Sequence, residues 1–468
     1  MNNKSITALL TGGALLLGFA AQSHAQSADA LLDKLVDKGV LTVKEANELR
    51  EQADEGFLKA YQSKSGMPDW VTQLKLYGDL RGRWDFITTP NDFPGANEPN
   101  KDRSRFRYRL RVGTTVQMKD AFELGFRLTS GEANSTFGGD PISGNATFQD
   151  NASKKFVWID LAYGKWTPIK SGPFFLSTTI GKMENPFVFS DMVFDPDYTP
   201  EGAAIQAGYV INDCHALKFN GGGFMLDEIN QGSQASDDPF FVGAQLRYDA
   251  KWSPCLDSSV GLSWLGIFHE QNLGNGAVPN VNVGNTRYAV ATGSHAVGDL
   301  VENFAPIVAD ANVTYTFEKF PLYSGPFPVK VGGEYIMNTG ADQDNEGYWV
   351  GLFLGKAGKK GTWEASYRFK RLESDAWYEE FVDSDTGAYR QVALAGSGQA
   401  AGYRAGTGLQ GHVGKLLYSL SDGFTLGVTY YLYELIDTPR VTGVFNGRDV
   451  TDKESHAHRV QVDAIWKF

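Results

Sequence analysis

The chain has 468 residues and a formal net charge of −12 at pH 7, with 53 glycines and 13% aromatic residues. The negative charge argues against nucleic acid as a partner, because binding to a phosphate backbone depends on positive charge. Beyond residue 25 no run reaches the length of about eighteen apolar residues that a spanning helix needs. If this part of the chain lies in a membrane, it must form a closed barrel, because no other strand structure satisfies its backbone in lipid.

The first 25 residues have the pattern of a secretory signal peptide. Lys4 precedes an apolar run from Ala8 to Ala21, and Ser23-His24-Ala25 follows as a small-x-small cleavage site. We therefore predict a signal peptide over 1–25 with cleavage after Ala25. An uncleaved anchor is the weaker alternative, because the run is too short to span a bilayer.

Residues 26–66 form the one stretch with helical spacing. Leu31, Leu32 and Leu35 share a helical face, and Thr42 with Glu45 forms a capping box for a second helix. The pattern predicts a short helical hairpin or coiled coil on the periplasmic side. Helices this short are marginal alone, so a mobile segment that packs only in an oligomer remains an open alternative.

From residue 67 onward the period changes to two, most clearly between Arg103 and Met118. Phe106, Tyr108 and Leu110 alternate there with arginines, so one face of the strand is apolar and the other is a row of guanidiniums. A water-soluble sandwich and a transmembrane barrel both fit this stretch alone. The barrel reading places the apolar face against lipid and the polar face in a wet lumen.

The same rhythm continues to the end of the sequence. We predict sixteen strands, at 73–87, 103–118, 122–128, 155–166, 174–183, 203–212, 215–228, 240–252, 256–269, 306–319, 327–338, 347–356, 361–374, 407–419, 423–436 and 457–468.

Loop lengths decide between the two alternatives. Short connections such as 119–120 and 252–256 alternate with long ones such as 131–153 and 270–305. Outer-membrane barrels have this asymmetry, with short periplasmic turns and long extracellular loops, whereas a sandwich has no reason for it. The fold prediction is therefore an all-β, sixteen-stranded antiparallel transmembrane β-barrel over 67–468, a size that leaves an aqueous channel.

Both cysteines fall in short turns of this barrel. An exported chain lies in an oxidising compartment, so Cys214 and Cys255 are a candidate disulfide. Two unpaired thiols are the alternative, because the turns must lean together before a bridge can form.

The sequence has no arrangement that predicts catalysis. No histidine accompanies a Gly-x-Ser-x-Gly elbow, and no phosphate-binding glycine loop precedes a helix. His456-x-His458 lacks further metal-ligand spacing. We therefore predict a protein that is not an enzyme and that uses no metal or cofactor.

The predicted lumen is lined by arginines that face an unusual loop. Arg81 and Arg83 have the same parity as the second strand's arginines, so the expected pore-lining set is Arg81, Arg83, Arg105, Arg107, Arg109 and Arg111. The third long loop, 184–202, has no Lys or Arg and seven large apolar residues; the acids expected at the constriction are Asp191, Asp195, Asp197 and Glu201.

Folding of this loop into the barrel would bury its apolar residues and bring its acids to the arginines. We expect a constriction with a transverse field that orients dipolar solutes. The alternative is a loop packed over the barrel mouth or against a neighbouring subunit.

Several motifs resemble the bacterial outer-membrane putative porin family, which is related to phosphate-selective porins. The resemblance is carried by 181–187 (GKMENPF), 195–197 (DPD), 199–202 (TPEG), 102–111 (DRSRFRYRLR) and the segment 31–49. It implies an outer-membrane diffusion channel for small hydrophilic solutes or ions, surrounded by lipid and commonly a homotrimer. Phosphate-selective relatives use basic residues at the constriction, and the third loop here has none. A structural or adhesive barrel plugged by its own loops, 270–305 and 375–406, is the alternative.

Overall fold

A computed structural model describes residues 67–89, 102–134, 138–139, 142–229, 237–273, 284–389, 404–436 and 456–468. The chain divides into two compact units, 1–72 and 73–468. The predicted signal peptide and nearly all of the predicted helical segment, 26–66, lie outside the described residues. Within the described ranges, no helix has the length and apolarity to cross a bilayer.

Sixteen long strands in the described ranges form the wall of a barrel. They are β1 Val71–Thr88, β2 Asp102–Met118, β3 Phe122–Gly131, β7 Phe156–Ile169, β8 Phe174–Lys182, β9 Glu201–Asn212, β10 His215–Met225, β11 Phe240–Ser253, β12 Leu256–Phe268, β13 Pro306–Phe317, β14 Phe327–Asn338, β15 Glu346–Gly355, β16 Trp363–Leu372, β19 Leu409–Ser421, β20 Phe424–Leu435 and β21 His456–Lys467. Each of the sixteen predicted strands is present, with ends within three residues of the prediction.

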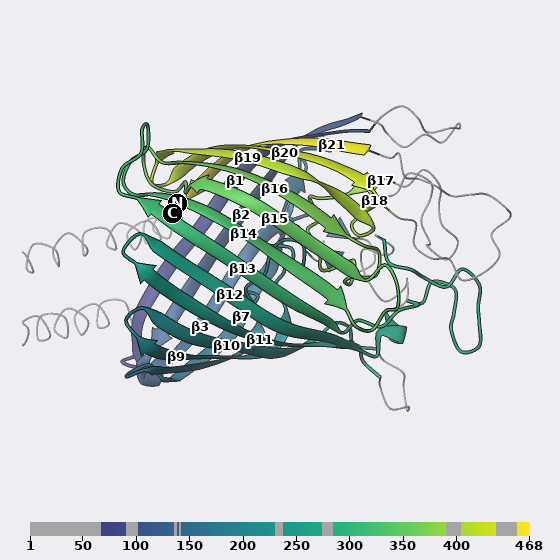
Figure 1. Ribbon diagram of the computed structural model, residues 1–468, viewed down its shortest axis with the longest axis horizontal. Helices are drawn as coiled ribbons and strands as arrows, with labels where there is room; N and C mark the ends of the chain where they lie inside the picture. Colours follow the sequence, from purple (N-terminus) through teal and green to yellow (C-terminus); the bar gives the residue numbers. More distant parts are fainter. Residues whose placement is uncertain are drawn as a thin grey trace, which may run out of the picture. The chain divides into compact units, whose positions relative to one another are not determined.

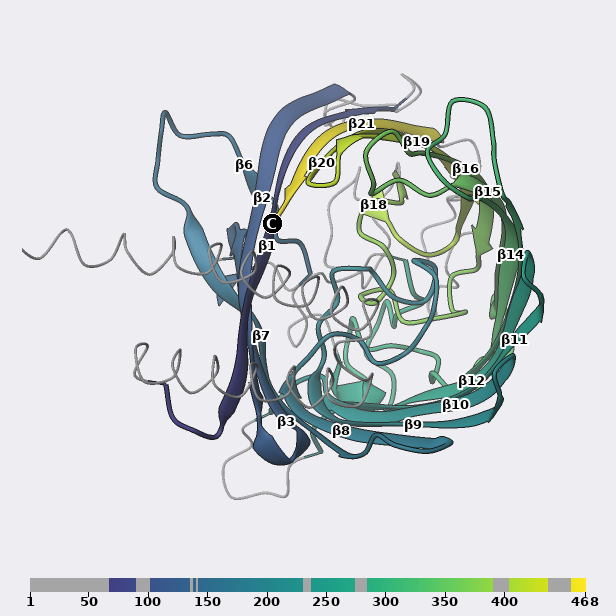
Figure 2. The same cartoon turned by 90° about the vertical axis from the view of Figure 1, so that its left-hand side faces the viewer.

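The sheet closes on itself, as the sequence predicts. Each strand pairs antiparallel with its neighbour in the chain, and β1 pairs with β21 in the register Leu80↔Trp466. Figure 1 shows the tilted strands from the side, and Figure 2 shows the ring that they form. Closure removes the free edges that a sheet could not expose to lipid.

The two faces of the strands divide as the alternation predicts. On β2, Phe106 is 58% exposed on the outside, whereas Arg107 beside it is 8% exposed and points inward. The same outward exposure of large apolar side chains recurs on other strands, for example at Leu246 on β11 and Leu262 on β12. An apolar outside with a charged inside is the arrangement of a barrel that lies in a bilayer.

Short strands that the sequence did not predict lie in the long connections. They are β4 Ala133–Asn134, β5 Gly138–Gly139, β6 Ala146–Thr147, β17 Ala388–Tyr389 and β18 Arg404–Ala405. β6 extends the wall, because it pairs with Arg107 and Tyr108 of β2 above the point where β3 ends. β17 and β18 pair with each other, and β18 lies inside the ring in Figure 2.

The predicted disulfide is absent, because Cys214 and Cys255 are both free thiols. Cys214 lies in the turn from β9 to β10, and Cys255 lies in the turn from β11 to β12. Turns two strand spacings apart are separated by about 10 Å, beyond the reach of about 7 Å between Cα atoms that a disulfide allows. Cys255 Sγ instead lies 3.3 Å from Ser253 Oγ.

Candidate functional site

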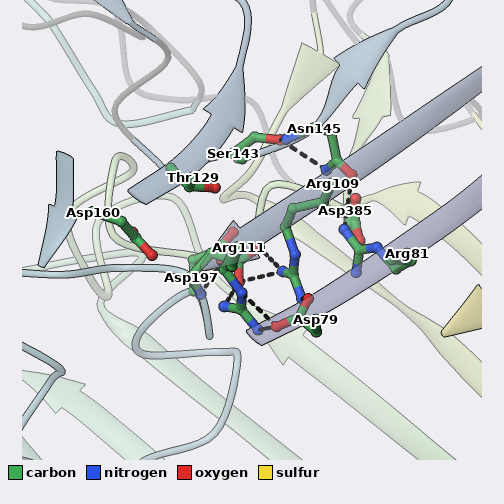
Figure 3. Close-up of polar contacts among 12 residues, drawn as sticks. Asp79, Arg81, Arg109, Arg111, Thr129, Ser143, Asn145, Asp160, Asp197 and Asp385 are labelled. Atoms are coloured by element: carbon green, nitrogen blue, oxygen red, sulfur yellow. Dashed lines mark hydrogen bonds and ion pairs between the residues drawn. The ribbon is translucent and has the colours of Figure 1, made fainter. Parts of the chain in front are cut away.

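The six predicted pore-lining arginines form one inward patch, which we call the arginine wall. Arg81 and Arg83 lie on β1, and the other four lie on the adjacent strand β2. Their common parity places all six on the lumen side, as predicted. Figure 3 shows Arg81, Arg109 and Arg111 of this wall with the carboxylates Asp79 and Asp197.

The third loop reaches the arginine wall through Asp197. Arg109 donates from Nη1 to Asp197 Oδ1 at 2.6 Å, and Nη1 of Arg111 lies 3.4 Å from the same oxygen (Figure 3). Asp79 of β1 shares both arginines, at 3.2 Å from Arg109 and 2.7 Å from Arg111. A contact of loop and wall through opposite charges is the geometry that the sequence predicts for a constriction.

Other carboxylates neutralise most of the remaining wall. Asp463 of β21 accepts from Arg83 at 2.7 Å, and Asp85 of β1 accepts from Arg105 at 2.7 Å. Asp85 also binds Arg459 of β21, at 2.7 Å. The wall is therefore an ion-paired network rather than a bare row of guanidiniums, because packed positive charges at this burial require counter-charges.

Two arginines of the wall have no ion pair with any described residue. Arg81 donates only to the amide oxygen of Asn145, at 2.8 Å (Figure 3). Arg107 donates to none of the described residues, and its Nε is buried without a partner. These two guanidiniums carry the positive charge that the described residues leave without an ion pair in the arginine wall.

The third loop enters the barrel and is held there by apolar burial. β8 ends at Lys182 and β9 begins at Glu201, so the loop covers 183–200. Met192 and Val193 are fully buried, and Phe194 is nearly so. They pack with inward aromatic side chains of the wall such as Phe241 on β11. The alternative of a loop lying over the mouth does not apply.

Hydrogen bonds from the wall fix the first half of the loop. The side-chain amide of Gln245 on β11 accepts from Val188 N and donates to Val188 O, both at 2.9 Å. Glu334 on β14 accepts from the backbone N–H of Ser190 at 3.1 Å and also from its hydroxyl. These contacts tie the loop to the wall opposite β1 and β2 in the strand order.

Three of the four predicted constriction acids do not meet the arginine wall. Asp191 binds Arg368 on β16 at 2.5 Å. Asp195 accepts from the backbone N–H of Ser384, at 2.9 Å. Glu201 lies on β9 rather than in the loop and binds Lys182 at 3.0 Å. Of the four, only Asp197 contacts the arginine wall in the described part of the chain.

A second inward segment, which the sequence reading missed as part of the site, packs on the third loop. Residues 373–389 follow β16, and we call them the inner segment. Trp377 is fully buried and donates from Nε1 to Val193 O at 2.8 Å. The backbone N–H of Asp195 donates to Phe381 O at 2.6 Å.

The inner segment also places a carboxylate in the ionic network. Asp385 lies 2.9 Å from Arg83 and 3.0 Å from Arg459. It occupies the counter-charge position that the sequence assigned to the acids of the third loop. A signal was present, because Trp377, Tyr378, Phe381 and Val382 make this stretch as apolar as the third loop.

Burial and nearby charges shift the pKa values of the carboxyl groups where the third loop meets the inner segment. Burial raises the pKa of Asp195 to about 6. Burial, with the like charges of Asp385 and Asp195, also raises the pKa of Asp383 well above its usual range. For Asp385 burial opposes ionisation, but the guanidiniums of Arg459 and Arg83 hold its pKa well below that range. The contact therefore combines one carboxylate with a lowered pKa and two with raised pKa values.

Cavities of about 400 Å³ lie in the barrel beside these segments. One is lined by the arginine wall and the inner segment, including Arg105, Arg107 and Asp385. A second is lined by the end of the third loop, β10 and the inner segment, including Tyr198 and Phe381. A third is lined by Tyr163 and Glu184 among others. In the described part of the chain, no group of three or more His, Cys, Asp or Glu side chains is placed to hold a metal ion.

Comparison with known proteins agrees with this architecture. Residues 87–266 match the family described as "Putative porin". No curated protein matches the chain.

Among solved structures, OprB of Pseudomonas putida has 10% identity and a TM-score of 0.49, covering 89% of this chain and 97% of its own. The outer membrane channel DcaP of Acinetobacter baumannii has 13% identity and a TM-score of 0.40, with 85% and 97% covered. A mutant porin of Rh. blastica has 10% identity and a TM-score of 0.36, with 85% and 100% covered.

The family match over 87–266 and the closed, apolar-sided barrel agree with the resemblance stated from the sequence. The apolar outside and the closed sheet are those of a barrel that lies in an outer membrane.

Proposed function

We propose that the barrel is a passive diffusion channel for small hydrophilic solutes or ions, narrowed where the third loop meets the arginine wall. The main observation in support is the contact of Asp197 with Arg109 at 2.6 Å, which joins the third loop to the arginine wall. The charged lumen and the apolar outside support the same conclusion. The residues proposed to line the passage are the six arginines and Asp197.

Fixed charges of both signs give such a passage its properties. Arginines on β1 and β2 face carboxylates of the third loop and the inner segment, so the field runs across the passage and orients dipolar solutes. Because most of these arginines are ion-paired, we expect weak rather than strict ion selectivity. The uncompensated Arg81 and Arg107 favour anions.

Planar bilayers and liposomes test this proposal. The purified protein should conduct in KCl and allow liposomes to swell in small sugars but not in large ones. Replacing Arg105, Arg107 and Arg109 together with Ala should lower the permeability of anions relative to cations. Arg371→Gln is the matched control, because Arg371 lies among outward residues and binds Gln410 at 3.1 Å. A reversal potential unchanged by the triple substitution would remove the wall from the passage.

One alternative rests on a specific observation. The inner segment fills part of the barrel, which also suits a structural or adhesive barrel plugged by its loops. A plugged barrel would give no stable conductance and no swelling, so the same measurements separate the two functions. Hydrolysis of a lipid or peptide substrate would instead support an enzyme, which the sequence does not predict.

The homotrimer implied by the resemblance also stays a prediction. Cross-linking of the protein in outer-membrane fragments should give a three-chain product that dissociates on heating. A single-chain product at all cross-linker concentrations would contradict it.

A further inference from the structure

Two adjoining cavities of the lumen differ in charge, and we propose that together they bind an amphipathic zwitterion, such as an amino acid with an apolar side chain. This inference rests on the proposed channel and names a class of solute for it. The first, which we call the anion cavity for its unpaired guanidiniums, is lined by five arginines and five carboxylates: Arg103, Arg105, Arg107, Arg404, Arg459, Glu132, Glu379, Glu380, Asp383 and Asp385. The second, the cation cavity, is lined by Tyr198, Phe381, Asp227 and Glu228 among others. Ile142 and Glu380 line both, so the two cavities adjoin.

The anion cavity contains a buried cation that lacks a counter-charge. Arg107 is 8% exposed, forms no ion pair with a described residue, and has an unpartnered Nε. Glu132 lines the same cavity, but its Oε1 accepts from the backbone N–H of Thr147 at 2.8 Å instead. Leaving a buried guanidinium unpaired is costly, so an anionic group of a solute is the natural partner.

Further cationic groups converge on that cavity. Arg404 of β18 lines it, and its guanidinium donates to the backbone oxygen of Ser384 and pairs with no carboxylate in the described ranges. Arg105 is held at its edge by Asp85 at 2.7 Å. A carboxylate entering here would meet two guanidiniums from different elements, and guanidinium forks match carboxylates well.

The cation cavity has more carboxylates than cations in its lining. Lys182 neutralises Glu201 at 3.0 Å. Asp227 and Glu228 also line this cavity and pair with no cation among the residues that the structure describes. A bare anion would be repelled by these carboxylates, whereas an ammonium group would be attracted.

The apolar body of such a solute also has a place. Tyr198 and Phe381 lie with ring centroids 5.0 Å apart and contribute an aromatic surface to the cation cavity. Tyr378 lines it as well and is 2% exposed. An aromatic surface beside a cation-attracting rim favours an ammonium group on an apolar body.

Solute-induced interruptions of the single-channel current test the proposal on the full-length protein. The probes are phenylalanine, phenylacetate and phenethylamine at pH 7, which share a ring and differ in charge. We expect phenylalanine to interrupt the current at concentrations about tenfold lower than either of the others, as one added charge-assisted contact predicts. Equal potency of phenylacetate would overturn the zwitterion assignment in favour of a plain anion site.

Two lumen variants separate the halves of the site. Arg107→Gln should raise the concentration of phenylalanine needed to interrupt the current about tenfold and leave that of phenethylamine unchanged. The double variant Asp227→Asn, Glu228→Gln should raise the concentration needed for phenylalanine but not for phenylacetate. Arg371→Gln on the outer surface is the control and should alter none of the three. If Arg107→Gln changes no probe, the inference fails while the channel remains; a protein that never conducts would contradict the proposed function itself.

Discussion

The two sides of the lumen hold the inward segments by opposite means. On the side of β10 to β16, inward residues such as Phe241 and Ile336 are apolar and pack on the third loop and the inner segment. On the side of β21, β1 and β2, the inward residues are charged, and contact is made through Asp197 and Asp385. Apolar burial is undirected and strong in sum, whereas ion pairs fix position. The apolar side therefore anchors the segments, and the ionic side determines the electrostatics of the passage.

The largest effect is expected from breaking the apolar side. Trp377→Ala removes a fully buried indole and its hydrogen bond to Val193. Large-to-small changes of this kind cost about 3–5 kcal/mol of free energy. We expect this cost to weaken the packing of the inner segment on the third loop rather than the stability of the barrel. We expect larger and noisier single-channel conductance, with unchanged heat-dependent migration on gels. Trp264→Ala on the outer face is the control, and an identical conductance in both would mean that the inner segment does not narrow the lumen.

A smaller effect is expected from breaking the ionic side. Asp385→Asn leaves Arg83 with Asp463 and Arg459 with Asp85, so each guanidinium keeps one carboxylate. The free-energy cost should be below the 3–5 kcal/mol of an orphaned buried charge. The lumen gains one positive charge, so the reversal potential in a KCl gradient should shift toward anions. A shift toward cations would contradict the assigned contacts.

The junction between the segments should respond to pH. The pKa of Asp195 is raised to about 6 in the folded state, above the ordinary value of about 3.9. The folded state therefore retains a proton that the free carboxyl releases, and docking weakens as the pH rises from about 4 through 6. Current noise should be lowest at pH 4–5 and highest above pH 6.

Asp195→Asn sharpens that prediction, because it fixes the neutral form. The variant should lose the part of the pH dependence that Asp195 causes, whereas Asp197→Asn should keep it with a midpoint at lower pH, because the charge of Asp197 contributes to the raised pKa of Asp195. Current noise that rises as the pH falls would mean that the pKa of Asp195 is lowered in the folded state rather than raised.

The sequence predicts the wall of this molecule far better than its interior. The period of two and the loop lengths are local signals, and they specify sixteen strands, their ends and the inward parity of Arg81 and Arg107. The apolar content of 184–202 also predicts burial inside the barrel. The choice of partners is different, because Asp191 with Arg368 and Asp385 with Arg83 join residues far apart in the chain.

The interior differs from the prediction at the acids of the third loop. Apolar burial and charge together predict that these acids face the arginine wall, whereas Asp191 binds Arg368 on β16 and Asp195 accepts from the backbone of Ser384. The same burial argument applied to Trp377, Tyr378 and Phe381 would have identified the inner segment. Cys214 and Cys255 show a similar limit of prediction at the rim of the barrel. An oxidising compartment and an even number of cysteines give no information on the distance between the two turns.

The most direct test of the central claim is the access of a water-soluble reagent to residue 197 in a conducting channel. The variant Asp197→Cys, with Cys214→Ser and Cys255→Ser to remove native thiols, should lose conductance when a charged thiol reagent is added. The same reagent should have no effect on Leu246→Cys, whose position is 55% exposed on the apolar outside. A current that is unchanged at position 197, or blocked only through position 246, would contradict a wet passage between the third loop and the arginine wall.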